Sequence, residues 1–177
     1  MQISYLCAIF GRIMRILFIT TVAVVCAVLF SSCTLPGGKL ARAREMVASG
    51  EAQCVLLVSG KIAVTKTGGG VSPLLEVYDQ YKPLMQDAVL ADKVIGRAAA
   101  FIAIAGGVRS VHAGVMSEDA RDLLRQHGAD AYCDILVPRI LNRNKSDLCP
   151  MEKAVAGITD PEEAVDILTA AVEKLKK

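Results

Sequence analysis

The residues best placed to bind a ligand follow Asp92. Asp92 is a favourable N-cap residue, and the run 93–105 after it is predicted to be a helix. Lys93 and Arg97 are four residues apart, which would place them on one helical face. Unpaired N–H groups and positive side chains at a helix N-terminus favour an anion. We therefore predict that Lys93 and Arg97 bind an anionic small molecule. The simpler alternative is a solvated Lys93 and an Arg97 paired with a nearby carboxylate.

A glycine run and a second capping residue extend this hypothesis. Gly68, Gly69 and Gly70 permit close approach of the backbone to a ligand, but no Gly-Lys-Ser/Thr follows them, so they are not a P-loop. Ser117 is expected to cap another helix and to contribute its N-terminus to the same ligand. The alternative for the glycines is a flexible connector between a hairpin and a helix.

A second cluster surrounds Pro150 and contains Arg139, Arg143, Asn144, Cys149 and Glu152. The dipole of a helix that starts at proline favours the thiolate of a preceding cysteine, so Cys149 is a weak catalytic candidate. It would need a histidine base, and the chain has only His112 and His127. Glu152 is the other weak candidate. The alternatives are a buried cysteine at the cap and a Glu152 placed there by the helix dipole alone. Whether the protein is an enzyme stays open.

The cysteines do not indicate a metal or a disulfide framework. Cys54, Cys133 and Cys149 are an odd number and form no C-x-x-C motif. Cys54 and Cys133 lie inside apolar, strand-like runs, where a cysteine usually acts as a small buried hydrophobe. We predict no metal ligands and no cofactor.

The N-terminal segment, residues 1–38, differs in composition from the rest. It has no charge between Ile16 and Gly38, and Arg12 and Arg15 precede this run. About 20 apolar residues fit an anchor helix or an export signal. Ser31-Ser32-Cys33 also resembles a lipoprotein cleavage site, which makes Cys33 a lipidation candidate. We expect membrane association. If the first codons are a misassigned start, the protein is instead cytoplasmic.

Residues 39–177 are predicted to form one domain. Arg12 and Arg15 are the only charges before Lys39, so 18 basic and 18 acidic residues remain. A formally neutral domain does not have the charge of a general nucleic-acid binder, and no nucleic-acid polymer is expected as partner. The oligomeric state stays open.

The predicted elements alternate after an initial hairpin. We expect helices over 39–48, from Pro73 to about Tyr78, over 93–105, from Ser117 to Gly128, near Pro150 and from about 160 onward. Strands are expected over 53–58, 61–65, 109–115 and 131–137, with Ser59-Gly60 as a hairpin turn. The all-apolar centre of 93–105 predicts a helix buried on every side. The pattern is typical of a mixed sheet covered on both faces.

The blocks 91–100 (ADKVIGRAAA) and 148–152 (LCPME) resemble a bacterial and archaeal family, domain of unknown function 1893. Leu136-Val137-Pro138, Arg139 and Asn142-Arg143 extend the match, which covers Leu40 to Lys177. The resemblance implies a cytidine-deaminase-like fold, a three-layer α/β/α sandwich in which an antiparallel pair is followed by parallel strands. It implies no catalytic role for any residue.

The resemblance also locates the helix starts that hold zinc in deaminases, which carry His or Cys with Glu, and Pro-Cys-x-x-Cys. Here these positions read Asp92-Lys93-Val94-Ile95 and Val115-Met116-Ser117-Glu118, with no His or Cys. We expect a metal-free cleft at paired helix N-termini that binds a nucleotide-like or other phosphorylated molecule. The alternative is a non-catalytic, membrane-tethered interaction or sensor domain.

Overall fold

A five-stranded mixed sheet organises the computed structural model, which describes residues 37–175. The strand order is β2-β1-β3-β4-β5, where β1 pairs antiparallel with β2 and β3, and β3, β4 and β5 run parallel. The strands are β1 (Cys54–Val58), β2 (Lys61–Lys66), β3 (Val89–Ile95), β4 (Ser110–Ser117) and β5 (Asp130–Val137). The mixed sheet with an N-terminal antiparallel hairpin is therefore confirmed.

The predicted turn between the first two strands is also confirmed. Ser59 and Gly60 both have positive φ, at 49° and 73°. Two consecutive residues of this kind match the right-handed twist of the strands on either side, which is why short hairpins favour them. Glycine adopts this conformation without the steric cost that a side chain brings.

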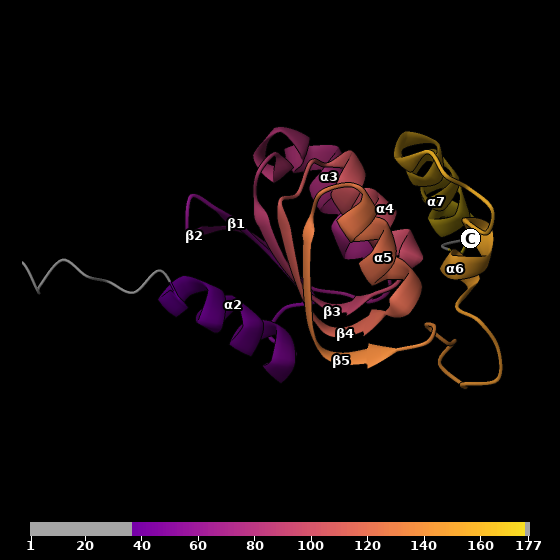
Figure 1. Cartoon of the computed structure of the whole chain (residues 1–177), viewed down its shortest axis with the longest axis horizontal. Coiled ribbons are helices and arrows are strands. Elements are labelled where there is room, and N and C mark those ends of the chain that lie inside the picture. Colours follow the sequence, from indigo (N-terminus) through magenta and orange to yellow (C-terminus); the bar gives the residue numbers. More distant parts are fainter. Residues whose placement is uncertain (1–36, 176–177) are drawn as a thin grey trace, which may run out of the picture. The chain divides into compact units, whose positions relative to one another are not determined.

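Helices cover both faces of the sheet (Figure 1). They are α2 (Gly37–Ser49), α3 (Ser72–Met85), α4 (Arg97–Ala105), α5 (Glu118–Gln126), α6 (Pro150–Ala154) and α7 (Pro161–Leu175). Among the described helices, only α2 packs on one face, where Ala43 and Val47 join Val55, Leu57 and Ala91 in a small core. Helices α3, α4 and α5 pack on the other face over the larger core. The α/β layers are those expected.

Helix α4 is the buried helix that its composition predicts. Six consecutive residues, Ala98 to Ala103, are buried. One side of α4 faces the sheet, and α7 packs against it from outside (Figure 1). Because most of these side chains are alanine, both neighbours can approach the helix closely. An all-apolar helix surface is thus explained by partners on more than one side.

The predicted start of this helix was wrong. The sequence predicted no strand before this helix, but β3 occupies residues 89–95, and α4 begins only at Arg97, after Gly96 as N-cap. Asp92 therefore caps no helix but lies inside a strand, 3% exposed. Its Oδ1 accepts hydrogen bonds from the side-chain amide of Gln53 and from the backbone N–H of Val94, both at 3.1 Å. The carboxylate of Asp92 therefore accepts hydrogen bonds from Gln53 and Val94 instead of from the first N–H groups of a helix.

The other predicted elements agree with the structure within a few residues, with one extension. Helix α3 continues past Tyr78 to Met85, but Tyr81 is non-helical and Pro83 lies in the last turn. Pro83 has no N–H to donate, so a kink near this point is expected. The predicted cap of α5 is confirmed, because Ser117 Oγ accepts from the N–H of Ala120 at 3.2 Å.

The N-terminal predictions concern residues outside the described range. Cys33, the lipidation candidate, and the apolar run before Gly37 lie there, so the signal, anchor and misassigned-start hypotheses remain predictions. Within residues 37–175, the helices are all too short or too polar to cross a membrane.

Candidate functional site

A cleft of about 710 Å³ opens where β3 extends beyond β1. The last residue pair between these strands is Cys54 opposite Asp92, so Lys93 and Val94 lie past the start of β1. Loops before α3 and after β5, together with α6 and the end of α7, complete the walls. The carboxyl ends of strands are where open α/β sheets bind ligands, and the volume suits a small molecule.

Apolar side chains form much of the cleft surface. They are Val71, Val94, Ala99, Ile140, Leu141, Pro150, Met151, Val172 and Leu175. The polar lining residues are Gln53, Ser72, Lys93, Asn142, Arg143, Asn144, Cys149 and Glu152. Gly69 and Gly70 add exposed backbone, and the buried Gly96 also borders the cleft. An apolar surface with a few convergent polar groups is typical of a ligand pocket.

Two cations from distant parts of the chain meet in this cleft. Lys93 is contributed by β3 and Arg143 by the loop after β5, and both side chains are exposed. Arg143 reaches the glycine loop, because a Cβ added to Gly69 would lie 3.8 Å from its Nη2. Within residues 37–175, neither Lys93 nor Arg143 forms an ion pair with a carboxylate. Their charges are therefore available to a ligand.

Glu152 occupies the N-terminus of α4, where we expected an external anion. Its Oε2 accepts from the N–H of Arg97 at 2.9 Å, and its Oε1 accepts from the N–H of Ala98 at 3.0 Å. Burial raises the pKa of Glu152, while these two N–H groups act in the opposite direction. A carboxylate bound in this way caps α4 from 55 residues away in sequence.

Gly96 is required by this contact. A Cβ at Gly96 would lie 2.4 Å from Oε1 of Glu152 and 2.9 Å from Cγ1 of Ile140. Any side chain would push the carboxylate away from the helix start. The family-like block around Gly96 and the block around Glu152 are thus in direct contact, which the linear sequence does not reveal.

Arg97, the second cation of the original hypothesis, is used within the fold. Its Nη2 donates to the carbonyl of Ile158 at 2.8 Å, and the guanidinium lies 5.0 Å from the ring centre of Phe101. Since Lys93 lies in β3 and Arg97 in α4, the prediction that they share one helical face was wrong. Arg97 does not line the cleft.

Other predicted residues divide between the cleft and the rest of the fold. Gly69, Gly70, Arg143, Cys149 and Glu152 line the cleft with Lys93. Gly68 lies beside Pro73, where an added Cβ would be 3.1 Å from Cγ of the proline. Arg139 is exposed outside the lining, and Ser117 is buried in capping α5.

Cys149 is not paired with a histidine base in the described structure. His112 lies in β4 beneath α2, and His127 is the exposed C-cap residue of α5, so both are outside the cleft. Cys149 is the N-cap residue of α6, and its N–H donates to the carbonyl of Ile140 at 3.0 Å. Both oxygens of Glu152 are engaged by N–H groups, which leaves no arranged acid–base pair with the thiol.

Asp92 is a residue whose position the sequence did not predict. It is buried behind Gln53, a cleft residue that donates to it. Burial raises the pKa of Asp92 to about 7, against the opposing effect of hydrogen bonds from Val94, Gln53 and Lys93. The signal available in the sequence is a lone acid within the apolar run 89–95.

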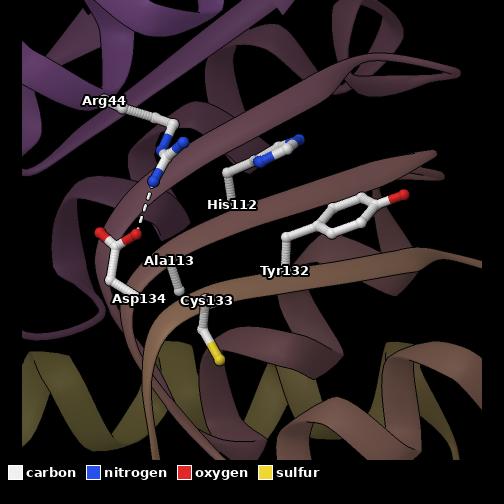
Figure 2. A pocket seen from close by; sticks show the side chains of 6 residues that line it. All are labelled: Arg44, His112, Ala113, Tyr132, Cys133 and Asp134. Atoms are coloured by element: carbon white, nitrogen blue, oxygen red, sulfur yellow. Dashed lines mark hydrogen bonds and ion pairs between the residues drawn. The ribbon is translucent and has the colours of Figure 1, made fainter.

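A second pocket, of about 240 Å³, lies on the α2 face (Figure 2). Arg44 of α2 forms an ion pair with Asp134 of β5, with 2.5 Å between Nη2 and Oδ1. The rings of His112 and Tyr132 stack, with centroids 4.8 Å apart. Burial, with a smaller contribution from Arg44, lowers the pKa of His112. An adjoining space of about 270 Å³ on the same face is bounded by Ala91, Gly114 and other residues, among them Lys93, which lines both this space and the cleft.

Chemistry in this second pocket is limited by its contacts. Ser110 Oγ lies 3.2 Å from Nε2 of His112, but Ser110 is 5% exposed and so is not an accessible nucleophile. Cys133 points away from the two rings (Figure 2). It is half-buried, whereas Cys54 is fully buried as predicted and its thiol pKa is raised by burial. Residues 37–175 contain no group of three His, Cys, Asp or Glu side chains able to hold a metal.

Comparison with known proteins identifies the family. Residues 42–172 match the family described as a domain of unknown function, DUF1893, and the chain belongs to it. The crystal structure of a DUF1893 family protein from Thermotoga maritima is similar, with a TM-score of 0.67 and 25% identity over 75% of this chain and 88% of that one. The resemblance drawn from residues 91–100 and 148–152 is therefore confirmed.

A deaminase is a more distant structural neighbour. The diaminohydroxyphosphoribosylaminopyrimidine deaminase/5-amino-6-(5-phosphoribosylamino)uracil reductase of Thermotoga maritima has a TM-score of 0.42 and 15% identity, covering 68% of this chain and 40% of that one. None of the curated proteins compared with the chain matches it.

Proposed function

We propose that this member of the DUF1893 family binds a small phosphorylated or otherwise anionic molecule in the cleft beyond β1. Nucleotide-like and other phosphorylated molecules both fall in this class. The observation that carries the proposal is that Lys93 and Arg143 line one cleft and that neither has a carboxylate partner within residues 37–175. A phosphate or carboxylate would form charge-assisted hydrogen bonds with both.

The contacts of Glu152, the carboxylate in the cleft lining, support an anionic ligand. Its two oxygens accept hydrogen bonds from the N–H groups of Arg97 and Ala98. It therefore does not neutralise Lys93 or Arg143 by a direct contact. Gly69 lies beside Arg143, and the exposed backbone of Gly69 and Gly70 in the lining offers further N–H donors to an anionic group.

The binding site differs from the one expected at two helix N-termini. The α4 N-terminus is capped by Glu152 and the α5 N-terminus by Ser117. The positive charge of the proposed site comes instead from side chains on a strand and a loop.

The proposal is tested by thermal unfolding and calorimetry of the full chain with inorganic phosphate, methyl phosphate and AMP. A probe present at 100 times its Kd stabilises a protein by about 2.7 kcal/mol. Arg143→Ala and Lys93→Ala should each weaken binding about tenfold, because each removes one charge-assisted contact. Arg139→Ala is the matched control, since Arg139 is an exposed arginine near the cleft but outside its lining. Equal affinity of wild type, Arg143→Ala and Lys93→Ala for every probe that binds, or no binding of any probe, would contradict the proposal.

A further inference from the structure

We infer that the ligand of this cleft is an aliphatic anion, a molecule with one phosphate or carboxylate group and a flexible hydrocarbon chain. This inference rests on the proposed function and specifies the other half of the ligand. Three observations support it: the exposed apolar side chains of the cleft, their aliphatic character, and the positions of the cations relative to them.

The first observation is the exposure of large apolar side chains at this site. Val94 is 37% exposed, Leu141 43% and Leu175 70%, and all three line the cleft. They come from β3, the loop after β5 and the end of α7, which are remote in sequence. Convergence of exposed hydrophobic side chains on one concave surface marks a binding site, whereas isolated ones do not.

The second observation is the kind of apolar side chain. Among the described lining residues there is no Phe, Tyr, Trp or His. Nucleobases are bound largely by stacking on aromatic rings, so the cleft offers a base no stacking surface. The stacked pair of His112 and Tyr132 lies in the pocket under α2 instead. Branched and thioether side chains such as Ile140, Met151 and Val172 suit a hydrocarbon chain.

The third observation concerns where charge and hydrocarbon enter the cleft. Lys93 and Arg143 belong to β3 and to the loop that meets Gly69, whereas Met151, Val172 and Leu175 belong to α6 and α7. A ligand that places its anionic group against Lys93 and Arg143 can extend its chain past Val94 and Leu141, which lie on the same two elements as the cations, to the side chains of α6 and α7. A volume of about 710 Å³ accommodates both parts of such a molecule.

The inference predicts a dependence of affinity on chain length. Burial of each methylene should lower Kd by about threefold to fourfold, since the free energy of moving one CH₂ out of water corresponds to that factor in a binding constant. In calorimetric titrations of the full chain with methyl, butyl, hexyl and octyl phosphate, Kd should fall by this factor per methylene. AMP should bind more weakly than hexyl phosphate because its base finds no ring on which to stack.

Variants separate the two halves of the ligand. Val94→Asn and Leu141→Asn place polar groups at already exposed positions of the lining. In each variant, Kd should fall by less than twofold per added methylene, which is the smaller gain per methylene that the inference predicts. Ile135→Asn is the matched control, because Ile135 is an exposed apolar residue, 57% exposed, outside this cleft; it should leave the gain unchanged. Arg143→Ala should raise Kd for the whole series by one common factor.

The outcomes distinguish the inference from the proposed function. If all alkyl phosphates bind alike and Arg143→Ala weakens them all, the aliphatic inference fails and the anion site stands. The inference also fails if AMP binds more tightly than hexyl phosphate, or if Ile135→Asn lowers the gain per methylene as much as Val94→Asn and Leu141→Asn do. If no alkyl phosphate binds, both proposals fail.

Discussion

The cleft beyond β1 and the pocket under α2 contain similar numbers of charged side chains but treat them differently. Under α2, Arg44 is paired with Asp134. In the cleft, Lys93 and Arg143 have no such partner within residues 37–175, and the carboxylate of Glu152 is directed at backbone N–H groups. The contrast shows that a charged residue indicates a ligand only when the fold itself leaves the charge unsatisfied.

The apolar surfaces of the two regions differ as well. The pocket under α2 presents the stacked rings of His112 and Tyr132, whereas the cleft presents aliphatic side chains. The two regions should therefore respond to different ligands. Asp92, which lines the space under α2, and Glu152, which lines the cleft, provide further ways to test the comparison.

The largest expected effect concerns the pH dependence of stability through Asp92. Its pKa in the folded protein is raised to about 7 from an ordinary value of 3.8. The folded state therefore favours the protonated acid, so its contribution to stability is fully present below about pH 4 and is lost as pH rises through about 7. Asp92→Asn removes this titration. Relative to that variant, the unfolding free energy of wild type should fall between pH 4 and pH 8 by up to about 4 kcal/mol.

Urea unfolding at several pH values measures this difference. Asp134→Asn serves as control, because Asp134 is half-exposed in its ion pair and should leave the pH dependence of wild type almost unchanged. Parallel curves for wild type and Asp92→Asn would show that the buried position of Asp92 does not govern its protonation.

The next effect compares two helix caps. Glu152→Ala removes a carboxylate that accepts two N–H groups of α4 and should lower the unfolding free energy by about 2–3 kcal/mol. Ser117→Ala removes one N–H acceptor from α5 and should cost about 1 kcal/mol. Glu152→Gln keeps one acceptor oxygen and should lie between wild type and Glu152→Ala. A smaller loss for Glu152→Ala than for Ser117→Ala would contradict the assignment of Glu152 as the cap of α4.

The smallest effect is expected from Arg44→Ala. Both partners of the Arg44–Asp134 pair are about half exposed, at 51% and 55%. Exposed ion pairs contribute little, so the melting midpoint should change by an amount equivalent to less than about 1 kcal/mol. Calorimetry should also show unchanged affinity for phosphate probes that Arg143→Ala weakens. A loss of affinity in Arg44→Ala equal to that in Arg143→Ala would remove the distinction between the two regions.

Local sequence signals predicted most of the elements. Ser59-Gly60 forms the hairpin turn with both residues at positive φ, which Gly60 adopts without steric cost, and Ser117 caps α5 with its own side chain. The alanine-rich run predicted a buried helix, and α4 is buried between the sheet and α7. Each of these signals depends on neighbouring residues or on composition within one element, which is why reading along the chain is enough.

Asp92 is a residue for which the local sequence signal gave the wrong element. An aspartate before an alanine-rich run resembles a helix cap, but the pairing of β3 with β1 and β4 keeps residues 89–95 extended. Gln53, 39 residues away, then supplies a donor for the carboxylate. Local cap preference is worth about 1 kcal/mol, which strand pairing on both sides readily exceeds.

Residue types and spacing predicted the hairpin, four of the five strands and the helices that alternate with them, and they singled out Lys93 and the glycine loop as candidates for a ligand. The resemblance of residues 91–100 and 148–152 gave the family. The central strand β3 was not predicted. Only the folded chain brings Arg143 to Gly69 and into one cleft with Lys93, places the Arg97 guanidinium at the carbonyl of Ile158, and places Glu152 at the start of α4. The physical reason is sequence separation. Contacts across some 55 to 75 residues depend on how the sheet and the loop after β5 pack, and no local propensity encodes a contact at that separation.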